Sequence, residues 1–371
     1  MINVYKCFPD GKFKVLTMSY DDGKHADRRL VKIFNDNGIK GTFNVNYGME
    51  GDPIRIPQSE YEELYKGHEI ACHTLTHPTI ARCPLEQATV QIFEDRKGLE
   101  KVTGRMIRGM AYPNGSYSDD VKTLLRLHGI KYARIVGNSD SFDLPTDFYE
   151  WKATCHHNHN LLQLGDEFAA LTKKQYLYMM YVWGHSYEFD RDNNWNVIEE
   201  FCKKAGNRDD VFYATNIEIY DYENAKKSIR RSADGKTFYN PTDIDVWVAK
   251  YDEPICIGAG KSTLDFGVPA MEVPKSGRKS DSQTWQLIAV AAAGVLLQTV
   301  TANDLASPNI IGINSGAGLA VILLLTLAPK AASWLPVGAF FGAFGAALVI
   351  LAAGHRMGSA RTGILLMGIA M

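Results

Sequence analysis

Short apolar stretches alternate with amphipathic stretches along the first two thirds of the chain. In the first kind, apolar residues alternate with polar ones or form a brief run, which is typical of strands. In the second kind, apolar residues recur every three or four positions, which predicts helices. The predicted strands are residues 13–18, 41–46, 67–72, 106–111, 131–136, 178–183 and 211–214, and the predicted helices are 25–37, 59–66, 85–102, 118–128 and 195–204.

Strand and helix alternate about seven times, which favours parallel strands closed or nearly closed into a barrel. We therefore predict an α/β fold whose functional residues follow the carboxyl ends of the strands. Three short strands are expected to complete this domain, which we bound at residues 1–257. They lie at 237–239, 245–249 and 254–257.

The rest of the chain has a different composition. Residues 258–284 are rich in Gly, Ser, Lys and Pro, which predicts a linker. Residues 285–371 hold few charged side chains and form the third predicted region, an all-α transmembrane segment of about three to four helices. Its apolar stretches lie at 285–302, 310–328 and 334–354, with a fragment at 363–371.

The net charge, the cysteines and the N-terminal sequence indicate which partners and which location to expect. The formal net charge is −2 over 371 residues, which gives no reason to expect a nucleic acid partner. The six cysteines are scattered without a Cys-x-x-Cys pair, so no disulfide framework is expected. No basic region followed by a long apolar run opens the chain. We therefore expect a cytoplasmic catalytic domain, held at the membrane by the C-terminal helices.

Candidate chemistry begins where the first strand ends in Asp21 and Asp22. Adjacent carboxylates repel, so burying them requires a cation. His73 and His77 follow with the i, i+4 spacing that places two imidazoles on one side of a helical turn. One carboxylate and two imidazoles leave coordination positions open, which is typical of a catalytic metal site. The alternatives are a solvated Asp-Asp-Gly turn and a pair of surface histidines.

Four motifs follow one another along the chain. They are Ser-Tyr-Asp-Asp-Gly at 19–23, His-Thr-Leu-Thr-His at 73–77, Arg-Gly-Met-Ala-Tyr-Pro-Asn-Gly at 108–115 and Trp-Gly-His at 183–185. In this order they resemble the motifs of the polysaccharide deacetylases, the NodB-homology or carbohydrate esterase 4 family, over about residues 10–257. The resemblance implies a distorted (β/α)7 barrel. It also implies a hydrolase that removes acetyl groups from N-acetylated, or O-acetylated, carbohydrate.

The resemblance assigns roles to these residues. Asp22, His73 and His77 are expected to bind a divalent metal, Zn²⁺ first, with Co²⁺, Ni²⁺ or Mn²⁺ as alternatives. Asp21 is expected to act as general base on a metal-bound water, the nucleophile. His185 is expected to protonate the leaving amine, a task that suits an imidazole near neutral pH.

The third motif departs from the commoner Arg-Pro-Pro-Tyr-Gly form. The resemblance gives Arg108 the task of orienting the general base, with a tight turn and a salt bridge as the alternative. Tyr112, Asn114 and Trp183 are expected to bind the sugar.

Two further groups are ambiguous. Asp143 or Asp147 is a candidate for the aspartate of the family's fourth motif. The run His156-His157-Asn158-His159 looks like a second metal centre, but we interpret it as polar lining, because clustered histidines in a loop more often have that role.

The C-terminal region carries a second resemblance. Residues 294–318 are similar to FecCD/BtuC-like iron–siderophore permeases of ABC transporters. The match lacks a first spanning helix and the later region that engages the ATPase, so we do not expect an ABC transporter ATPase as partner. Arg278 and Lys279 favour a cytoplasmic linker. The alternative functions are a membrane transport fusion protein, including one from a frameshift, and a carbohydrate-binding pseudoenzyme.

Overall fold

The structure is a computed structural model that describes residues 4–233, 235–250 and 253–263, with single positions at 338, 341, 342, 344 and 345. Apart from these five positions, the predicted transmembrane stretches lie outside the described residues, as does most of the predicted linker. Within the described part, no helix combines the length and the apolar character needed to cross a bilayer. The first compact unit of the chain is Met1–Ala270.

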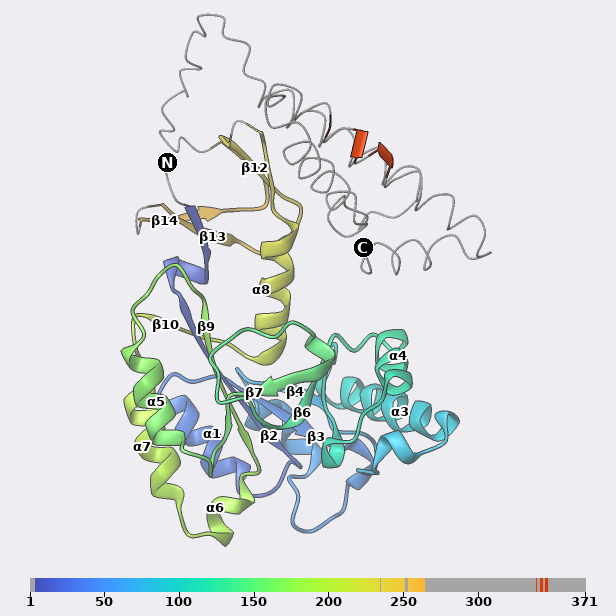
Figure 1. Ribbon diagram of the computed structural model, residues 1–371. Coiled ribbons are helices and arrows are strands. Elements are labelled where there is room, and N and C mark those ends of the chain that lie inside the picture. Colours follow the sequence, from blue (N-terminus) through green and yellow to red (C-terminus); the bar gives the residue numbers. More distant parts are fainter. Residues whose placement is uncertain are drawn as a thin grey trace, which may run out of the picture. The chain divides into compact units, whose positions relative to one another are not determined.

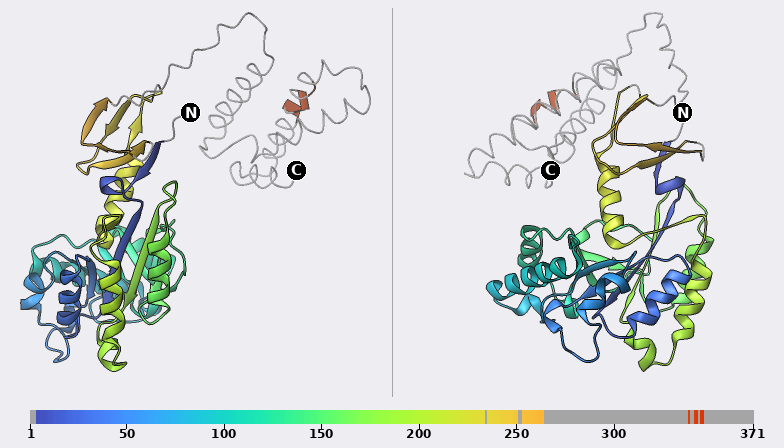
Figure 2. Two further views of the ribbon diagram at one scale, coloured as in Figure 1. Left: turned by 90° about the vertical axis from the view of Figure 1, so that its left-hand side faces the viewer. Right: turned by 180° about the vertical axis from the view of Figure 1, so that it is seen from behind.

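A sheet of nine parallel strands forms the centre of the described chain (Figures 1 and 2). Its order is β7-β6-β5-β4-β3-β2-β9-β8, with β10 also paired to β2. The fully buried strand β2 (Lys14–Asp21) pairs with β10 (Val211–Tyr213) along its first half and β3 (Gly41–Val45) along its second. Strand β9 (Tyr178–Gly184) pairs with nearly all of β2. The other strands are β4 (Glu69–Cys72), β5 (Gly109–Ala111), β6 (Tyr132–Asn138), β7 (Trp151–Ala153) and β8 (Cys155–His156).

The prediction of an α/β fold with parallel strands is confirmed, but the barrel requires a correction. Among the described residues the hydrogen-bonded strand order is open and ends at β7 and β8. Both strands are very short, so no continuous ladder joins them across the gap. Thr154, which separates them, instead uses its Oγ1 atom to donate to Met179 O at 3.3 Å and accept from Tyr181 N at 3.0 Å.

Helices cover the sheet on both sides (Figures 1 and 2). Helix α8 begins with a capping box, because Thr215 Oγ1 and Glu218 each accept from the other's backbone amide. Helix α3 ends at Gly104, whose φ of 65° allows the left-handed cap. The helices are α1 (Asp27–Asp36), α2 (Tyr61–Leu64), α3 (Leu85–Thr103), α4 (Asp119–Leu127), α5 (Leu161–Ala170), α6 (Tyr187–Arg191), α7 (Trp195–Ala205) and α8 (Asn216–Ser228).

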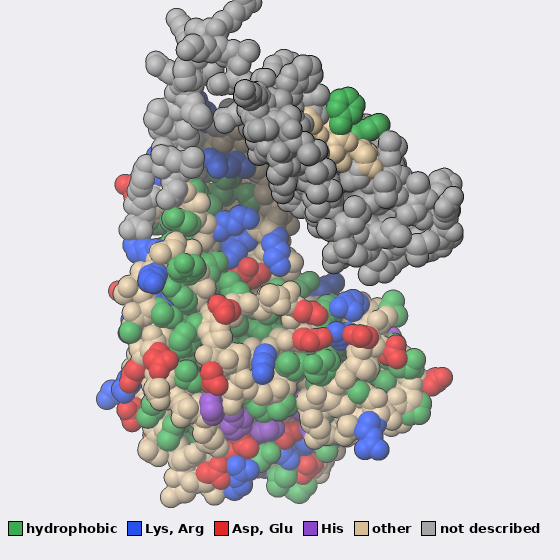
Figure 3. Space-filling model, viewed as in Figure 1, with side chains coloured by type: hydrophobic (Ala, Val, Ile, Leu, Met, Phe, Trp, Pro, Cys, Tyr) green, Lys and Arg blue, Asp and Glu red, His purple; other side chains and the backbone are tan. Residues whose placement is uncertain are grey.

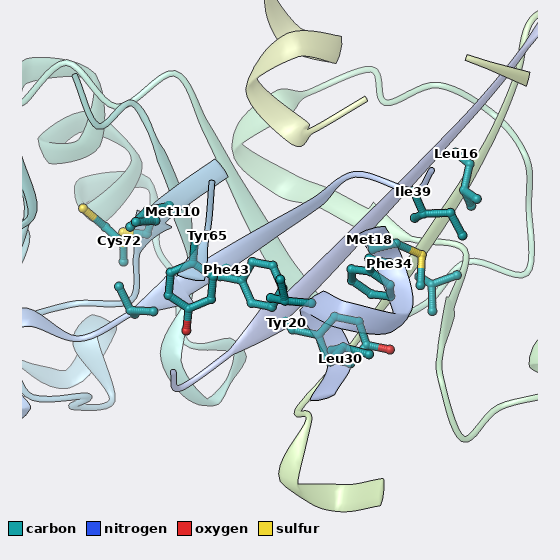
Figure 4. Packing of buried hydrophobic residues seen from close by; sticks show 14 of the residues in the cluster. Leu16, Met18, Tyr20, Leu30, Phe34, Ile39, Phe43, Tyr65, Cys72 and Met110 are labelled. Atoms are coloured by element: carbon teal, nitrogen blue, oxygen red, sulfur yellow. The ribbon is translucent and has the colours of Figure 1, made fainter. Parts of the chain in front are cut away.

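The main core lies between β2, its neighbouring strands and α1, as Figure 4 shows. Phe43 and Tyr65 pack with ring centroids 4.6 Å apart, and Tyr20 meets Phe34 edge-on at 5.8 Å. Burying aromatic side chains of this size contributes much of the stability of such a core. The core therefore fixes β2, the strand that ends at the candidate site.

Two small antiparallel sheets complete the unit. They are β1 (Val4–Cys7), β13 (Val246–Lys250) and β14 (Glu253–Ile257), and β11 (Arg230–Arg231), β12 (Thr237–Asn240) and β15 (Gly260–Thr263). Phe238, Val248 and Ile257 join the two sheets in one buried cluster. The three predicted short strands are present, and β15 extends regular structure into the first residues of the predicted linker.

Candidate metal and catalytic site

The predicted catalytic residues share one edge of the central sheet. Asp21 is the last residue of β2, His73 follows β4, and His185 follows β9. Because these strands are parallel, their carboxyl ends meet at the same edge. Figure 3 shows histidine side chains gathered among acidic and basic side chains in the lower part of that view.

Asp22, His73 and His77 converge. Each offers a ligand atom, and these atoms all lie within 4.8 Å of one another. The Nδ1 atom of His73 is 2.9 Å from the carbonyl oxygen of Ala111. Since a carbonyl can only accept, Nδ1 carries the proton and Nε2 keeps a free lone pair. The donor set of one carboxylate and two imidazoles fits Zn²⁺ or a similar divalent ion.

The two histidines reach each other from a loop, which corrects the expectation of a helical turn. Thr74 and His77 have φ values of 64° and 58°, in the left-handed region that ends a right-handed helix. The backbone amide of His77 donates to Thr74 Oγ1 at 3.1 Å. Asn46 Nδ2 donates to the carbonyl oxygens of His73 and Thr74 at 2.6 and 2.8 Å. Hydrogen bonds to side chains therefore hold the loop.

Burial keeps the His73 ring neutral. It lowers the pKa of His73 to about 4, so the imidazole can act as a ligand at neutral pH. The backbone amide of His73 donates to Asp95 Oδ2 at 3.0 Å, and Tyr47 N donates to Asp95 Oδ1 at 2.7 Å. Burial also raises the pKa of Asp95 to about 7. Asp95 thus anchors the strand end that carries His73.

Asp21 is a buried carboxylate held in its ionised form. Burial opposes ionisation, but the adjacent Arg134 guanidinium outweighs it and lowers the pKa of Asp21. Arg134 pairs with Oδ2, and Asn44 Nδ2 donates to Oδ1 at 2.8 Å. The ring of Trp183 lies 4.4 Å from the Arg134 guanidinium. The arginine is completely buried, so this pairing fixes the orientation of Asp21.

Arg108 does not orient the base, which corrects its predicted role. It precedes β5 and therefore lies at the opposite end of a parallel strand from the site. Its two terminal nitrogens donate to the carboxylate of Asp221 at 2.8 and 2.6 Å. The structure gives the contact with Asp21 to Arg134 in β6 instead.

Asp22 sits in a strained turn that a second arginine supports. Its φ is 80°, unusual for a residue with a side chain. Arg55 donates from Nη1 to the carbonyl oxygen of Asp22, and its Nη2 lies 3.6 Å from Oδ1. Asp22 N donates to Asn44 O at 2.9 Å. These contacts direct the Asp22 carboxylate toward His77, whose Nε2 is 3.9 Å from Oδ1.

His185 faces a glutamate one helical turn further along. Its Nδ1 atom lies 3.5 Å from Oε2 of Glu188 in α6. Burial opposes protonation, but the carboxylates of Glu188 and Asp21 outweigh it and raise the pKa of His185.

Asp143 and Asp147, the candidates for the fourth-motif aspartate, have local hydrogen-bond partners. Ser141 Oγ donates to Asp143, and Tyr149 N donates to Asp147.

The predicted sugar-binding residues are unequal in exposure. Tyr112 is 1% exposed and donates from its hydroxyl to Tyr149 O at 3.0 Å. Trp183 is also buried, against Arg134. Asn114 lies on the surface and donates from Nδ2 to Thr79 Oγ1 at 3.3 Å. Sugar contacts for Tyr112, Trp183 and Asn114 therefore stay predictions, and the burial of the two rings leaves little of either open to a ligand.

Comparison with known proteins agrees with both resemblances. The polysaccharide deacetylase family matches residues 9–133. The FecCD transport family matches residues 288–371. The predicted recognition of both families is confirmed.

Individual relatives match only parts of the chain. A chitin deacetylase from Pestalotiopsis sp. is 27% identical over 131 residues, which is 35% of this chain and 43% of that protein. The iron(3+)-hydroxamate import system permease protein FhuB from Salmonella typhimurium is 39% identical over 85 residues, 23% of this chain and 12% of that protein. The structure of peptidoglycan deacetylase PdaC from Bacillus subtilis covers 59% of this chain and 96% of its own, at 14% identity and a TM-score of 0.38. The chain thus spans less than half the length of these two sequence relatives.

Proposed function

We propose that the α/β unit is a metal-dependent deacetylase acting on N-acetylated, or O-acetylated, carbohydrate. The observation that carries the proposal is the meeting of Asp22, His73 and His77 beside the ionised Asp21. The polysaccharide deacetylase match at residues 9–133 and the chitin deacetylase relative support the substrate class. The products are acetate and a free amine, or a free hydroxyl from an ester.

The protonation state of each residue indicates its proposed role in the reaction. Asp22, His73 and His77 would hold the cation, Zn²⁺ before Co²⁺, Ni²⁺ or Mn²⁺. A bound cation supplies Lewis acidity, which activates water and polarises a carbonyl oxygen. Asp21, ionised beside Arg134, accepts the proton of the attacking water. His185, whose pKa is raised by Glu188, donates a proton to the leaving group.

Acetate release by the full-length chain tests this proposal. The substrates are N-acetylated glucosamine oligomers and O-acetylated xylan, each offered to protein as purified, after chelation and after return of Zn²⁺ or Co²⁺. We expect release that chelation abolishes and metal restores. Sugar binding without acetate release from any substrate, with metal restored, would instead identify a carbohydrate-binding pseudoenzyme.

The FecCD match supports a second role for the C-terminal region. We also propose that residues 285–371 attach the deacetylase unit to a membrane as a transport-protein fusion. The full-length chain should then fractionate with membranes and be released by detergent but not by high salt. Co-purification with an ATPase would indicate a working permease and contradict a role as anchor alone.

A further inference from the structure

Three imidazoles surround one carboxylate oxygen next to the candidate catalytic site. The atoms His156 Nε2, His157 Nε2 and His185 Nδ1 lie 3.0, 3.3 and 3.5 Å from Glu188 Oε2. His156 ends β8, His157 follows it, and Glu188 is in the first turn of α6. The deacetylase role proposed above uses only His185 and its contact with Glu188, so His156 and His157 need another explanation.

His157 is the most unusual member. Its side chain is 0% exposed, and neither ring nitrogen has a hydrogen-bond partner among the described residues. The ring stacks on Tyr20 and on Phe189, at centroid distances of 5.7 and 4.1 Å. A Cβ atom at residue 184 would overlap Nδ1, so the ring can occupy this place only because that residue is Gly184. The fold therefore holds a buried polar ring with Nε2 directed at Glu188, although an unpaired buried group is unfavourable.

His156 is held more loosely and can be reached from solvent. Its backbone amide donates to Asn138 Oδ1 at 2.7 Å, and its side chain is 19% exposed. The Nδ1 atom accepts from Asn158 N at 3.2 Å, so Nε2 carries the proton and points to Glu188. Binding a cation through Nε2 requires the proton to move to Nδ1. That change disrupts one long, exposed hydrogen bond and releases no net proton.

We propose that His156, His157 and Glu188 form a second centre for a divalent cation. Each offers a ligand atom, and the three atoms lie within 4.8 Å of one another. Two imidazoles and a carboxylate are a donor set of the kind that binds Zn²⁺. A cation there also gives the buried Nε2 atom of His157 the partner that it lacks. This set shares no residue with Asp22, His73 and His77.

Filling the second centre would affect the neighbouring histidine. The oxygen that would bind the cation, Glu188 Oε2, is the one that faces His185. A cation on this oxygen would take the carboxylate contact from His185, the proton donor of the proposed deacetylase. This consequence rests on the proposed deacetylase function, whereas cation binding itself does not.

Counting bound ions tests the second centre. The full-length chain is stripped with chelator, dialysed against buffered Zn²⁺ and analysed for metal per chain. We expect two ions in the natural chain and one in each of His156→Ala and His77→Ala. His159→Ala is the matched control, because His159 belongs to the same histidine run but pairs with Asp140 at 2.8 Å. This control should keep two ions.

One ion in the natural chain, or two ions in both His156→Ala and Glu188→Gln, would overturn the inference. Glu188→Gln keeps the shape of the side chain, so its folding is expected to survive, and circular dichroism checks every variant. Ion counting needs no turnover. Two ions without acetate release would therefore remove the proposed function and keep the second centre, and acetate release with one ion would do the reverse.

Discussion

The two histidine clusters at the carboxyl edge of the sheet are built from similar donors but are held differently. In the first, His73 is fixed by hydrogen bonds, since Nδ1 binds Ala111 O and the backbone amide binds Asp95. In the second, His157 is fixed by stacking, and its ring nitrogens have no such bonds within the described part of the chain.

This difference bears on how tightly each cluster can bind an ion. A hydrogen bond to the second ring nitrogen sets the tautomer and raises the basicity of the ligand atom, which strengthens metal binding. His73 has that support, and His156 has the opposite tautomer. We therefore expect Zn²⁺ to fill the cluster of Asp22, His73 and His77 at lower concentration than the cluster of His156, His157 and Glu188.

The largest expected effect is a loss of acetate release in a variant that keeps the metal ligands of the first cluster. Asp21→Asn removes the proton acceptor but none of the proposed ligands, so acetate release should fall by about 10²–10⁴-fold while the ion count is unchanged. Asp36→Asn, on the exposed end of α1, is the control. Acetate release by Asp21→Asn at the natural rate would show that Asp21 is not the base.

Replacing each of two arginines by lysine tests which of them orients Asp21. Arg134→Lys loses the guanidinium that orients Asp21, and acetate release should fall on the order of 10–100-fold. Arg108→Lys alters a partly exposed pair with Asp221, so activity should persist and stability should change by about 0–1 kcal/mol. Equal losses of activity in both variants would contradict the assignment to Arg134.

Excess Zn²⁺ should act on the second cluster alone. Once the first cluster is full, added Zn²⁺ is expected to slow acetate release, because Glu188 Oε2 is withdrawn from His185. The loss should be smaller than in the arginine variant, since the His185 ring remains in place. His156→Ala should resist this inhibition and His159→Ala should not. Inhibition of equal strength in His156→Ala would place the inhibitory ion elsewhere.

The smallest effect is expected at Asp27, a buried carboxyl, and it concerns the stability of the fold. It accepts from Tyr65 Oη at 2.7 Å and from the hydroxyl of Ser186, the neighbour of His185. Burial raises the pKa of Asp27 from 3.8 to about 7, so the folded state favours the protonated carboxyl. Its contribution to stability is therefore complete below the unfolded pKa and is lost as the pH rises toward about 7.

Urea unfolding across this window measures the effect. The free energy of unfolding of the natural chain, relative to Asp27→Asn, should fall between about pH 4 and pH 7. The fall is a few kcal/mol at most, since one pKa unit corresponds to about 1.4 kcal/mol. A difference that does not change with pH would mean that Asp27 titrates alike in both states.

The sequence alone predicted the positions of candidate catalytic residues that directly follow a strand. The alternating pattern before Asp21 predicts the end of β2, and the topology then brings His73 and His185 to the same edge. The loop that carries His77 was less predictable. The i, i+4 spacing suits a helix, but Pro78 and the left-handed conformations of Thr74 and His77 exclude one.

The site residues that the sequence did not predict owe their positions to partners far away in the sequence or to irregular segments. Arg134 lies in the middle of a strand, where a charged residue normally faces solvent, and only the position of Asp21 explains its burial. Glu188 gave a weak local signal, three residues after His185, but α6 was not predicted. Arg55 comes from an irregular loop, and no periodic pattern marks such a position.

Strand β2 has a consequence for synthesis of the chain on the ribosome. The partner that lies along most of its length, β9, begins at residue 178, and β10 begins at residue 211. A growing chain that has reached β8 therefore exposes an unpaired edge of the fully buried strand β2, a condition that favours aggregation. We expect the nascent α/β unit to depend on chaperones until β10 has left the exit tunnel.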